Sequence, residues 1–392
     1  MAHRARFPQR ISGTLAGMRI IVIGSGIAGA ATAYELARRG ADVVVADAGL
    51  PGAATAAGAG IVSPWTSRAP DGAALTFAAR AAAYYRTLVQ RLAEDGHGDS
   101  SFEVVGGMVV AAGEPELADL HRRLTARAAA WPEAGSVTRL DPARARALFP
   151  PLAPGLGAVH VTGSARVDGR RLRETLLRAA VGRGARTVQG RAEPHVTAGT
   201  VTGVRVAGDV EPADRVVVAA GAWSAEPLAP LGVTVPVAPQ RGQISHFGLP
   251  GTDTAPWPVV LPAASSHYLL AFPGGRVVAG ATRETGSGFD HRVTVAGQRE
   301  VLAEALEVAP GLADATLLET RVGFRPASPD GEPLLGPLPG HPEVVLLSGF
   351  GPAGLTLGPY AGVLAARVAL GEPVPAEAAA LDPGRFGELS AP

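Results

Sequence analysis

The stretch "MRIIVIGSGIAGAATAYELARRGADVVVAD", residues 18–47, decides the fold. Its unbroken apolar run over residues 20–23 is typical of a parallel strand that is buried on both faces. Apolar residues at helical spacing follow and stop at Gly40, which suits a helix C-terminus. A second apolar run over residues 43–45 predicts the next strand. The order strand, turn, helix, strand predicts an α/β fold that begins with a parallel sheet.

Three glycines between the first strand and the helix match the pattern G-x-G-x-x-G. Gly24 permits the tight turn, Gly26 lets the backbone approach a pyrophosphate, and Gly29 lets helix and strand pack closely. Asp47 ends the second strand, about 20 residues beyond the glycines, where a carboxylate can accept both ribose hydroxyls of an adenosine. The combination indicates a Rossmann-like domain that binds a dinucleotide.

The composition excludes several classes of protein. The 392 residues are 47% hydrophobic and 18% charged with a formal net charge of zero, which fits one or two globular domains and gives no basic surface for nucleic acid. No apolar run is long enough to span a membrane. Residues 1–17 lack the pattern of a secretory signal and are expected to form a loose arm, so a cytoplasmic location is expected.

The chain also lacks the side chains of several catalytic mechanisms. It has no cysteine, and all 35 residues of the Lys and Arg class are arginine. Thiolate nucleophiles, cysteinyl cofactor bonds and lysine Schiff bases are therefore excluded. The nine histidines are scattered, so no metal site is predicted. Such a chain is expected to take its chemistry from a cofactor.

Two further segments favour FAD over NAD. Residues 52–64, "GAATAAGAGIVSP", are small almost throughout and can run tightly along a pyrophosphate and a flavin ring. Residues 213–224, "ADRVVVAAGAWS", form another apolar strand that ends in small residues. A strand that returns to the cofactor so late in the chain is unusual for a plain NAD domain, although an NAD dehydrogenase stays an alternative.

Five segments in order resemble the glycine oxidase and D-amino-acid oxidase family of flavoproteins, and the glycine oxidase branch most closely. They are "GSGIAGAATAYELARRG", "TAAGAGIVSP", "RVDGRRLRETLLRAA", "VVVAAGAWS" with "PQRGQ", and a C-terminal block with "GATRETGSGFD", "GFRPASPDGEPLLG" and "SGFGPAGLTLGPYAG". The resemblance implies a Rossmann-like FAD-binding domain and a substrate domain built on a large, mostly antiparallel sheet.

The chain is expected to pass between these two domains more than once. The FAD-binding domain is assigned residues 18–80, 150–225 and 318–385, and the substrate domain residues 81–149 and 226–317. Strands are expected within residues 102–112 and 233–282.

Beyond the helix that follows the glycine turn, four more helices are expected from the sequence pattern. They span residues 71–95 with Asp71 as the N-cap, residues 166–185, Arg299–Val308, and residues 355–370. The Arg and Glu residues of the second of these helices are interpreted as a solvated face.

The resemblance implies which residues hold a noncovalent FAD. Thr55 stands where related dimethylglycine dehydrogenases carry a histidine bonded to the flavin, so no covalent bond is expected. The start of the C-terminal helix would face the flavin pyrimidine edge, where the positive end of a helix stabilises negative charge on the reduced ring. The cofactor-binding residues are predicted to be Gly24, Gly26, Ile27, Ala28, Gly29, Asp47, Thr55, Ala56, Ala57, Gly58, Gly60, Ile61, Glu193, Ala220, Gly221, Gly351, Ala353, Gly354, Leu355 and Thr356.

Two residues are predicted to hold the substrate. Arg325 occupies the arginine of the "GFRP" motif, which in relatives binds the substrate carboxylate through a two-pronged ion pair, as a planar guanidinium suits. An internal salt bridge to Asp330 or Glu332 is the alternative. Tyr268 corresponds to a tyrosine that contacts the substrate in glycine oxidase, and packing within the sheet is its alternative. His267 should point to the opposite face and be structural.

Some residues depart from the glycine oxidase pattern around the substrate. Pro352 replaces an arginine of many relatives, Phe350 a histidine, and Arg283 a methionine of some. These residues and Ile61 are predicted to shape the substrate pocket. Since Pro352 and Phe350 remove polar groups, we expect a larger amine or side-chain substituent than in glycine.

The function implied is FAD-dependent oxidation of the C–N bond of a small or N-substituted amino acid, of the glycine, sarcosine or D-amino-acid type. Hydride transfer to the flavin would give an imine and then a 2-oxo acid. A flavin-dependent 2-hydroxy-acid dehydrogenase and a non-catalytic flavoprotein are the alternatives. The sequence leaves open whether oxygen or another acceptor takes the electrons, and whether the chain forms a homo-oligomer.

Overall fold

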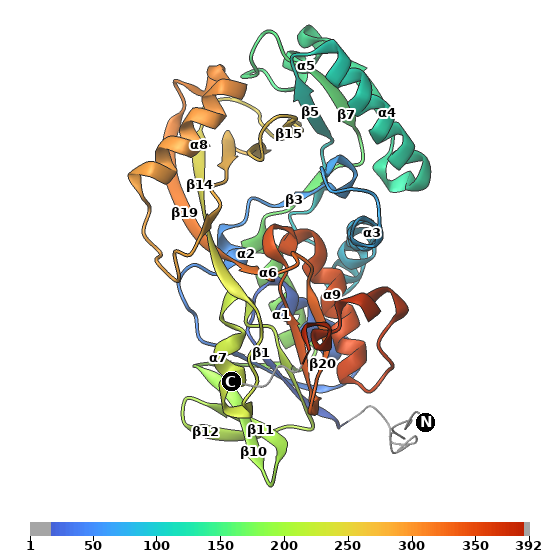
Figure 1. The fold of residues 1–392 in the computed structure, drawn as a ribbon, viewed down its shortest axis with the longest axis vertical. Coiled ribbons are helices and arrows are strands. Elements are labelled where there is room, and N and C mark those ends of the chain that lie inside the picture. Colours follow the sequence, from blue (N-terminus) through green and yellow to red (C-terminus); the bar gives the residue numbers. More distant parts are fainter. Residues whose placement is uncertain (1–16, 388–392) are drawn as a thin grey trace.

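The computed structural model describes residues 17–387. The predicted arm of residues 1–17 lies outside them except for Gly17. The lower part of the molecule is built on a six-stranded, mainly parallel sheet and the upper part on a nine-stranded, mainly antiparallel sheet (Figure 1). The predicted α/β fold with a second, antiparallel sheet is confirmed. None of the helices within residues 17–387 is long and apolar enough to cross a membrane.

The parallel sheet has the predicted glycine-turn strand at its centre. Strand β1 lies between two parallel neighbours, and Ile20, Ile21 and Val22 are completely shielded from solvent. Only the edge strand β20 runs antiparallel to its neighbour. In sheet order the strands are β20 (Leu334–Leu338), β21 (His341–Ser348), β13 (Arg215–Val218), β1 (Arg19–Ile23), β2 (Asp42–Asp47) and β9 (Arg186–Gln189).

Three helices cover one face of this sheet: α1 (Ile27–Arg38), α6 (Gly169–Gly182) and α9 (Gly354–Ala369). Two glycines of α9 allow it to lie close against α1, because a Cβ at Gly358 would meet Ile27 at 2.8 Å and one at Gly362 would meet the carbonyl oxygen of Ala28 at 2.8 Å. The opposite face packs against the sheet of β10 (Ala192–Thr197), β11 (Thr200–Val206) and β12 (Asp209–Pro212). The sheet is therefore covered on both faces, as parallel sheets require.

The large sheet is covered by α4 (Glu114–Ala130) on one face and by α5 (Pro142–Leu148) and α8 (Val295–Val308) on the other. Eight of its strands follow in the order β18 (Glu284–Thr285), β14 (Ala238–Gly248), β17 (Arg276–Gly280), β16 (Tyr268–Phe272), β15 (Val259–Pro262), β5 (Gly107–Ala111), β7 (Gly157–Val161) and β6 (Val137–Leu140). The ninth strand, β19 (Thr316–Ala327), also pairs with β14.

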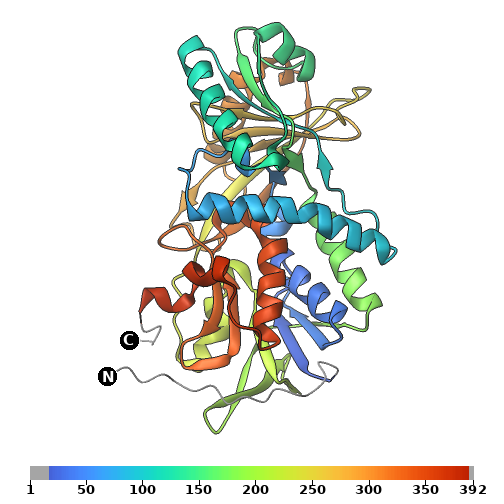
Figure 2. The same ribbon diagram turned by 90° about the vertical axis from the view of Figure 1, so that its right-hand side faces the viewer.

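The long helix α3 (Ala73–Glu94) lies across the molecule between the two sheets (Figure 2). It confirms the predicted helix, but the predicted N-cap was wrong: Gly72 precedes the helix, and the Asp71 carboxylate accepts a hydrogen bond of 2.8 Å from Nε of Arg127 instead. The buried guanidinium of Arg127 also donates to the carbonyls of Trp65, Ser67 and Ala69. The carboxylate of Asp71 therefore binds a distant arginine and does not cap its own helix.

Two other predicted helices are present with shifted ends. Helix α8 begins four residues before the predicted start at Arg299, because the side chain of Thr294 caps it by accepting from the amide of Gly297. Helix α6 begins after Asp168, whose carboxylate accepts from the amide of Arg170.

The two sheets draw on alternating segments of the chain, and we propose them as two domains that the chain enters more than once. The predicted boundary at residue 150 does not follow this division, because β7 pairs with β5 and β6 of the large sheet. A boundary after β7 suits the strand pairing better. The next strand along the chain, β8 (Ala165–Arg166), already belongs to a separate small sheet with β3 (Ile61–Val62) and β4 (Glu103–Val104).

Candidate functional site

A cavity of about 550 Å³ runs from the glycine turn of the parallel sheet to the face of the large sheet. Its size and mixed lining are those of a cofactor or substrate site. Most of the predicted site residues line it, namely Gly24, Gly26, Ile27, Ala28, Asp47, Thr55, Gly58, Gly60, Ile61, Glu193, Ala220, Gly221, Tyr268, Arg283, Arg325, Phe350, Gly351, Pro352, Gly354 and Leu355. Five do not border the cavity: Gly29, Ala56, Ala57, Ala353 and Thr356.

The glycine turn has the geometry that the motif predicts. Gly24 has a φ of +99°, and a Cβ there would meet the carbonyl oxygen of Ala219 at 2.4 Å. A Cβ at Gly29 would lie 2.0 Å from the carbonyl oxygen of Gly24. Gly29 therefore acts by close packing behind the turn. The turn brings the N-terminus of α1 to the cavity wall, where the positive end of the helix suits an anionic group.

Asp47 lies at the end of β2 as predicted and is already held from two sides. Its Oδ2 accepts from the amide and hydroxyl of Ser25 at 2.5 and 2.6 Å, and Oδ1 accepts from the amide of Gly49 at 2.7 Å. Burial alone would raise the pKa of Asp47, but these bonds and the charge of Arg173 outweigh it and lower the pKa. The group is therefore a fixed carboxylate, suited to accept hydroxyls.

The interpretation of the α6 charges as a solvated face was wrong for Arg173, whereas Arg170 is exposed but also contacts the site. Arg173 donates from Nε to the carbonyl of Ser25 at 2.6 Å and from Nη2 to the hydroxyl of the same residue. Arg170 donates to the carbonyl of Ala56 at 2.8 Å. Helix α6 thus braces both backbone segments that line the nucleotide end of the cavity.

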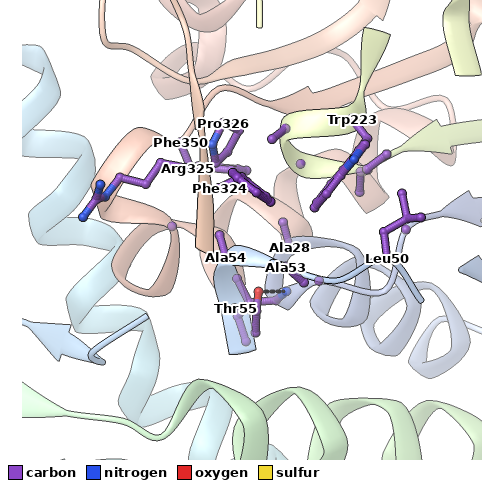
Figure 3. A pocket seen from close by; sticks show the side chains of 18 of the residues that line it. Ala28, Leu50, Ala53, Ala54, Thr55, Trp223, Phe324, Arg325, Pro326 and Phe350 are labelled. Atoms are coloured by element: carbon purple, nitrogen blue, oxygen red, sulfur yellow. Dashed lines mark hydrogen bonds between the residues drawn. The ribbon is translucent and has the colours of Figure 1, made fainter. Parts of the chain in front are cut away.

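The small-residue segment forms the short helix α2 (Ala54–Ala57) and then turns along the cavity. The hydroxyl of Thr55 accepts from the amide of Ile27 at 2.9 Å, which ties the segment to the start of α1 (Figure 3). Gly60 has a φ of +99°, and a Cβ there would lie 1.8 Å from the carbonyl oxygen of Val167. Ala57 faces Gly323 of β19, where an added Cβ would meet it at 2.6 Å.

The start of α9 lies at the same cavity. Gly354 begins the helix, and Gly354 and Leu355 line the wall. The amide of Ala353 is engaged with the carbonyl of Phe350 at 3.0 Å, and Thr356 donates to the carbonyl of Ile61 at 3.0 Å. Ala353 and Thr356 therefore hold the helix start in place and lie behind the wall.

Sequence reasoning missed an aromatic cluster beside the cavity. Trp223 and Phe324 both line it, with ring centroids 5.8 Å apart in an edge-to-face arrangement. Phe289 stacks on Trp223 with centroids 4.9 Å apart. Phe324 leaves β19 toward Trp223, whereas its neighbour Arg325 points the other way (Figure 3). Trp223 stood inside the quoted segment "VVVAAGAWS", but nothing local showed that it would meet a strand a hundred residues later.

Arg325 is a largely buried cation without a counter-ion among residues 17–387. Its Nη1 donates to the carbonyls of Thr282 at 2.9 Å and Arg241 at 3.4 Å. Its Nη2 and Nε have no acceptor in the described chain. Asp330 pairs with Arg385 at 2.8 Å, so the alternative of an Arg325–Asp330 salt bridge is wrong. Burial lowers the pKa of Arg325, the direction expected for a cation that is shielded from water.

Tyr268 faces the cavity from β16, near Arg325. Burial raises the pKa of Tyr268 to about 12, and the charges of Arg325 and Arg283 act against this rise. Its hydroxyl has no hydrogen-bond partner among residues 17–387. His267 lies on the other side, 3.4 Å from Glu300 and 3.5 Å from Glu304 of α8, which fits the structural role expected for it.

Glycines make room for both of these side chains on the neighbouring strands. A Cβ at Gly242 of β14 would meet the guanidinium of Arg325 at 2.6 Å, and one at Gly280 of β17 would meet the hydroxyl of Tyr268 at 2.6 Å. The two side chains therefore lie flat across bare backbone. The face of the sheet between them is open to a ligand.

The charges divide the cavity into two halves. All acidic residues that line it, Asp47, Glu193 and Glu226, belong to the nucleotide end around β2 and β10. The half beside the large sheet is lined by Arg325, Arg283, Tyr268 and Ser266 among apolar residues. This cavity fits FAD with an anionic substrate beyond it, since the glycine turn and Asp47 suit the adenosine diphosphate part and the α9 start suits the flavin.

Comparisons with known proteins agree with this arrangement. The profile of the DAO family, described as FAD dependent oxidoreductase, matches residues 19–368. The chain is 32% identical to glycine oxidase of Pseudomonas putida, covering 94% of this chain and 99% of that protein. It is 44% identical to the oxidoreductase YurR of Bacillus subtilis, covering 93% and 98%.

Solved structures show the same relationship in three dimensions. The crystal structure of iminodiacetate oxidase from Chelativorans sp. BNC1 superposes with a TM-score of 0.90 at 47% identity, over 93% of this chain and 99% of that one. Glycine oxidase of Geobacillus kaustophilus superposes with a TM-score of 0.80 at 26% identity, over 93% and 98%. The chain therefore belongs to the DAO family of FAD-dependent oxidoreductases, and FAD is its cofactor.

Proposed function

We propose that the protein oxidises the C–N bond of a small, N-substituted amino acid, giving an imine that water hydrolyses to a 2-oxo acid and an amine. The observation that carries this proposal is the uncompensated guanidinium of Arg325, held on two backbone carbonyls at the substrate end of the FAD cavity. One relative is named for the oxidation of a small amino acid, glycine, and one solved neighbour for that of an N-substituted one, iminodiacetate, which supports the choice.

FAD, when bound, would supply a two-electron acceptor for the hydride on the carbon between the amine and the carboxylate. The protein's own contribution is orientation. Because Nη1 of Arg325 is fixed on the carbonyls, the Nη2 and Nε donors form a fork aimed at a carboxylate. Tyr268 offers its hydroxyl as a further donor, because a phenol is protonated at neutral pH and burial raises its pKa further. The donors of these two side chains together set the position of the reacting carbon.

The amine must be neutral so that its lone pair can assist the departure of the hydride. No acidic side chain lines the substrate half of the cavity among residues 17–387, and two guanidiniums do. Nearby positive charge disfavours an ammonium ion. The site therefore favours the reactive form of the amine without a catalytic base.

Turnover of matched substrates with an artificial electron acceptor tests this proposal. We expect sarcosine and N-ethylglycine to be better substrates than glycine by about five- to thirtyfold in kcat/KM, since burying one or two extra methylenes contributes about 1–2 kcal/mol. Iminodiacetate is measured in the same series. D-Alanine, D-proline and glycolate complete the series. If glycolate is oxidised and no amine is, the 2-hydroxy-acid dehydrogenase alternative replaces this proposal.

Replacing Asp47 with Ala should weaken FAD binding more than it changes turnover of the enzyme that remains loaded. Hydrogen bonds to a charged group contribute about 1.5–3 kcal/mol, so the Kd of FAD should rise about ten- to a hundredfold. Titration of the apoprotein with FAD measures this. Asp42→Ala is the control, because Asp42 lies at the other end of β2 and pairs with Arg19 at 2.6 Å. An unchanged Kd in Asp47→Ala would show that this carboxylate does not hold the ribose.

Replacing Gly242 with Ala should lower kcat/KM without loss of FAD. The added Cβ would displace the Arg325 guanidinium, and a misplacement of about 1 Å can lower the rate about a hundredfold. A carboxylate inhibitor without an amine, such as methoxyacetate, should bind more weakly in parallel. Gly155→Ala is the matched control, because a Cβ there meets nothing within 4 Å. Normal kinetics in Gly242→Ala would argue against the flat placement of Arg325.

A further inference from the structure

Arg283 is a second uncompensated cation of the substrate half. It follows β17 at the cavity wall, is exposed, and makes no ion pair or hydrogen bond within the described chain. Its neighbours along the chain are fixed. The carbonyl of Thr282 accepts from Arg325, and the carboxylate of Glu284 accepts from Nη2 of Arg241 at 2.6 Å. Thr282 and Glu284 therefore fix the backbone on both sides of Arg283, at the same end of the cavity as Arg325.

The side chains of this segment alternate, as expected for an extended chain. Ala281 and Arg283 line the cavity. The hydroxyl of Thr282 points the other way and donates to Glu284 at 2.7 Å while accepting from the amide of Gln243 at 2.9 Å. The carboxylate nearest to Arg283 in the sequence is therefore occupied by Arg241, Gln243 and Thr282.

The charge of Arg283 interacts with those of two other arginines, Arg325 and Arg68. The charge of Arg283 acts on the pKa of Arg325 and of Tyr268 on one side, and on the pKa of Arg68 on the other. Burial and Arg283 lower the pKa of Arg68, whose Nη2 donates to the carbonyl of Pro262. None of these three arginines has an acidic partner within 4.0 Å in residues 17–387. Like charges without counter-ions raise the free energy of the site until an anion binds.

We propose that Arg283 binds a second anionic group on the substrate, so that the preferred substrate is an amine carrying two carboxylates, one held by Arg325 and the other by Arg283. This inference rests on the proposed function and narrows its substrate class to N-carboxyalkyl amino acids, of which iminodiacetate is the smallest. It also refines the expectation from Pro352 and Phe350, since the larger substituent would carry a negative charge at its end.

The first test uses unreactive probes and the holoenzyme. Methoxyacetate and diglycolate are ethers in which oxygen replaces the amine, with one and two carboxylates respectively. Their Kd values follow from changes in the flavin absorbance. We expect diglycolate to bind about tenfold or more tightly than methoxyacetate, since a hydrogen-bonded charge pair is added. The difference should shrink as salt is raised, because Arg283 is exposed. Equal Kd values would overturn the proposal.

The second test uses Arg283→Gln, which removes the charge and keeps much of the side-chain volume. The ratio of kcat/KM for iminodiacetate to that for sarcosine should fall about tenfold or more, and Arg283→Lys should restore part of it. Arg122→Gln, which removes an exposed arginine paired with Asp119, should leave the ratio as in the wild type. A ratio that stays unchanged in Arg283→Gln would contradict the assignment.

The two proposals fail in different ways. If the proposed function is wrong, no amine reduces the flavin of the wild-type enzyme, whereas the binding comparison of the two ethers still decides the role of Arg283. If only the inference is wrong, sarcosine and iminodiacetate are both oxidised and neither their ratio nor the ether binding depends on Arg283.

Discussion

Arg325→Lys is expected to fold, to bind FAD and to lose about a thousandfold or more in kcat/KM, because lysine keeps the charge but not the fork that orients a carboxylate. Lysine also cannot rest one nitrogen on the carbonyls of Thr282 and Arg241 while presenting two others to the substrate. The loss should appear in kcat as well as in KM, since orientation of the reacting carbon is disturbed together with binding.

A matched control lies on the same strand. Arg321 of β19 pairs with Glu319 and does not border the cavity, so Arg321→Lys makes the same substitution away from the substrate site. It should leave kcat/KM near the wild-type value. Binding of methoxyacetate should weaken in Arg325→Lys and stay normal in the control. Near-normal kinetics for Arg325→Lys would mean that this arginine has only a structural role.

Gly29→Ala is expected to abolish most cofactor loading. The added Cβ would lie 2.0 Å from the carbonyl oxygen of Gly24 and 3.3 Å from Cβ of Ala219, so α1 must move away from the turn. Both contacts are with rigid structure, and overpacking of this kind costs about 1–3 kcal/mol. If that cost falls on the bound state, the Kd of FAD rises by up to about a hundredfold. Titration of apoprotein measures it.

Gly182→Ala supplies the control for this prediction. Gly182 is also in a helix, α6, but an added Cβ comes no nearer than 3.7 Å to a neighbouring atom. Alanine is the better helix former, so this variant should be as stable as the wild type or slightly more so, by up to about 1 kcal/mol. Wild-type FAD affinity in Gly29→Ala would show that the turn tolerates a displaced helix.

The parts of the site that the sequence predicted are those encoded locally. The glycine turn and Asp47 follow from one contiguous stretch, because their spacing is set by a strand and a helix of ordinary length. Arg325 was found through a motif in which it adjoins Pro326. Its alternative partner, Asp330, was excluded only by the structure, where the C-terminal Arg385 reaches that carboxylate.

The parts that could not be predicted depend on strand pairing between distant segments. Gly242 faces Arg325 only because β14 and β19 pair with one particular register, Gly242 opposite Gly323. Gly280 lies under Tyr268 through the pairing of β16 with β17. Arg173 reaches Ser25 from a helix whose place beside the glycine turn depends on tertiary packing and is not encoded in any local pattern. A periodicity shows which face of an element is buried, but not which element covers it.

The most direct test of the central claim is an anaerobic single turnover of the holoenzyme with iminodiacetate. The flavin absorbance and the products are measured in the same sample. We expect the flavin to be fully reduced, with one glyoxylate and one glycine formed for each FAD, and the reduction to slow about a thousandfold in Arg325→Lys. A flavin that stays oxidised with iminodiacetate, sarcosine and glycine alike would contradict it.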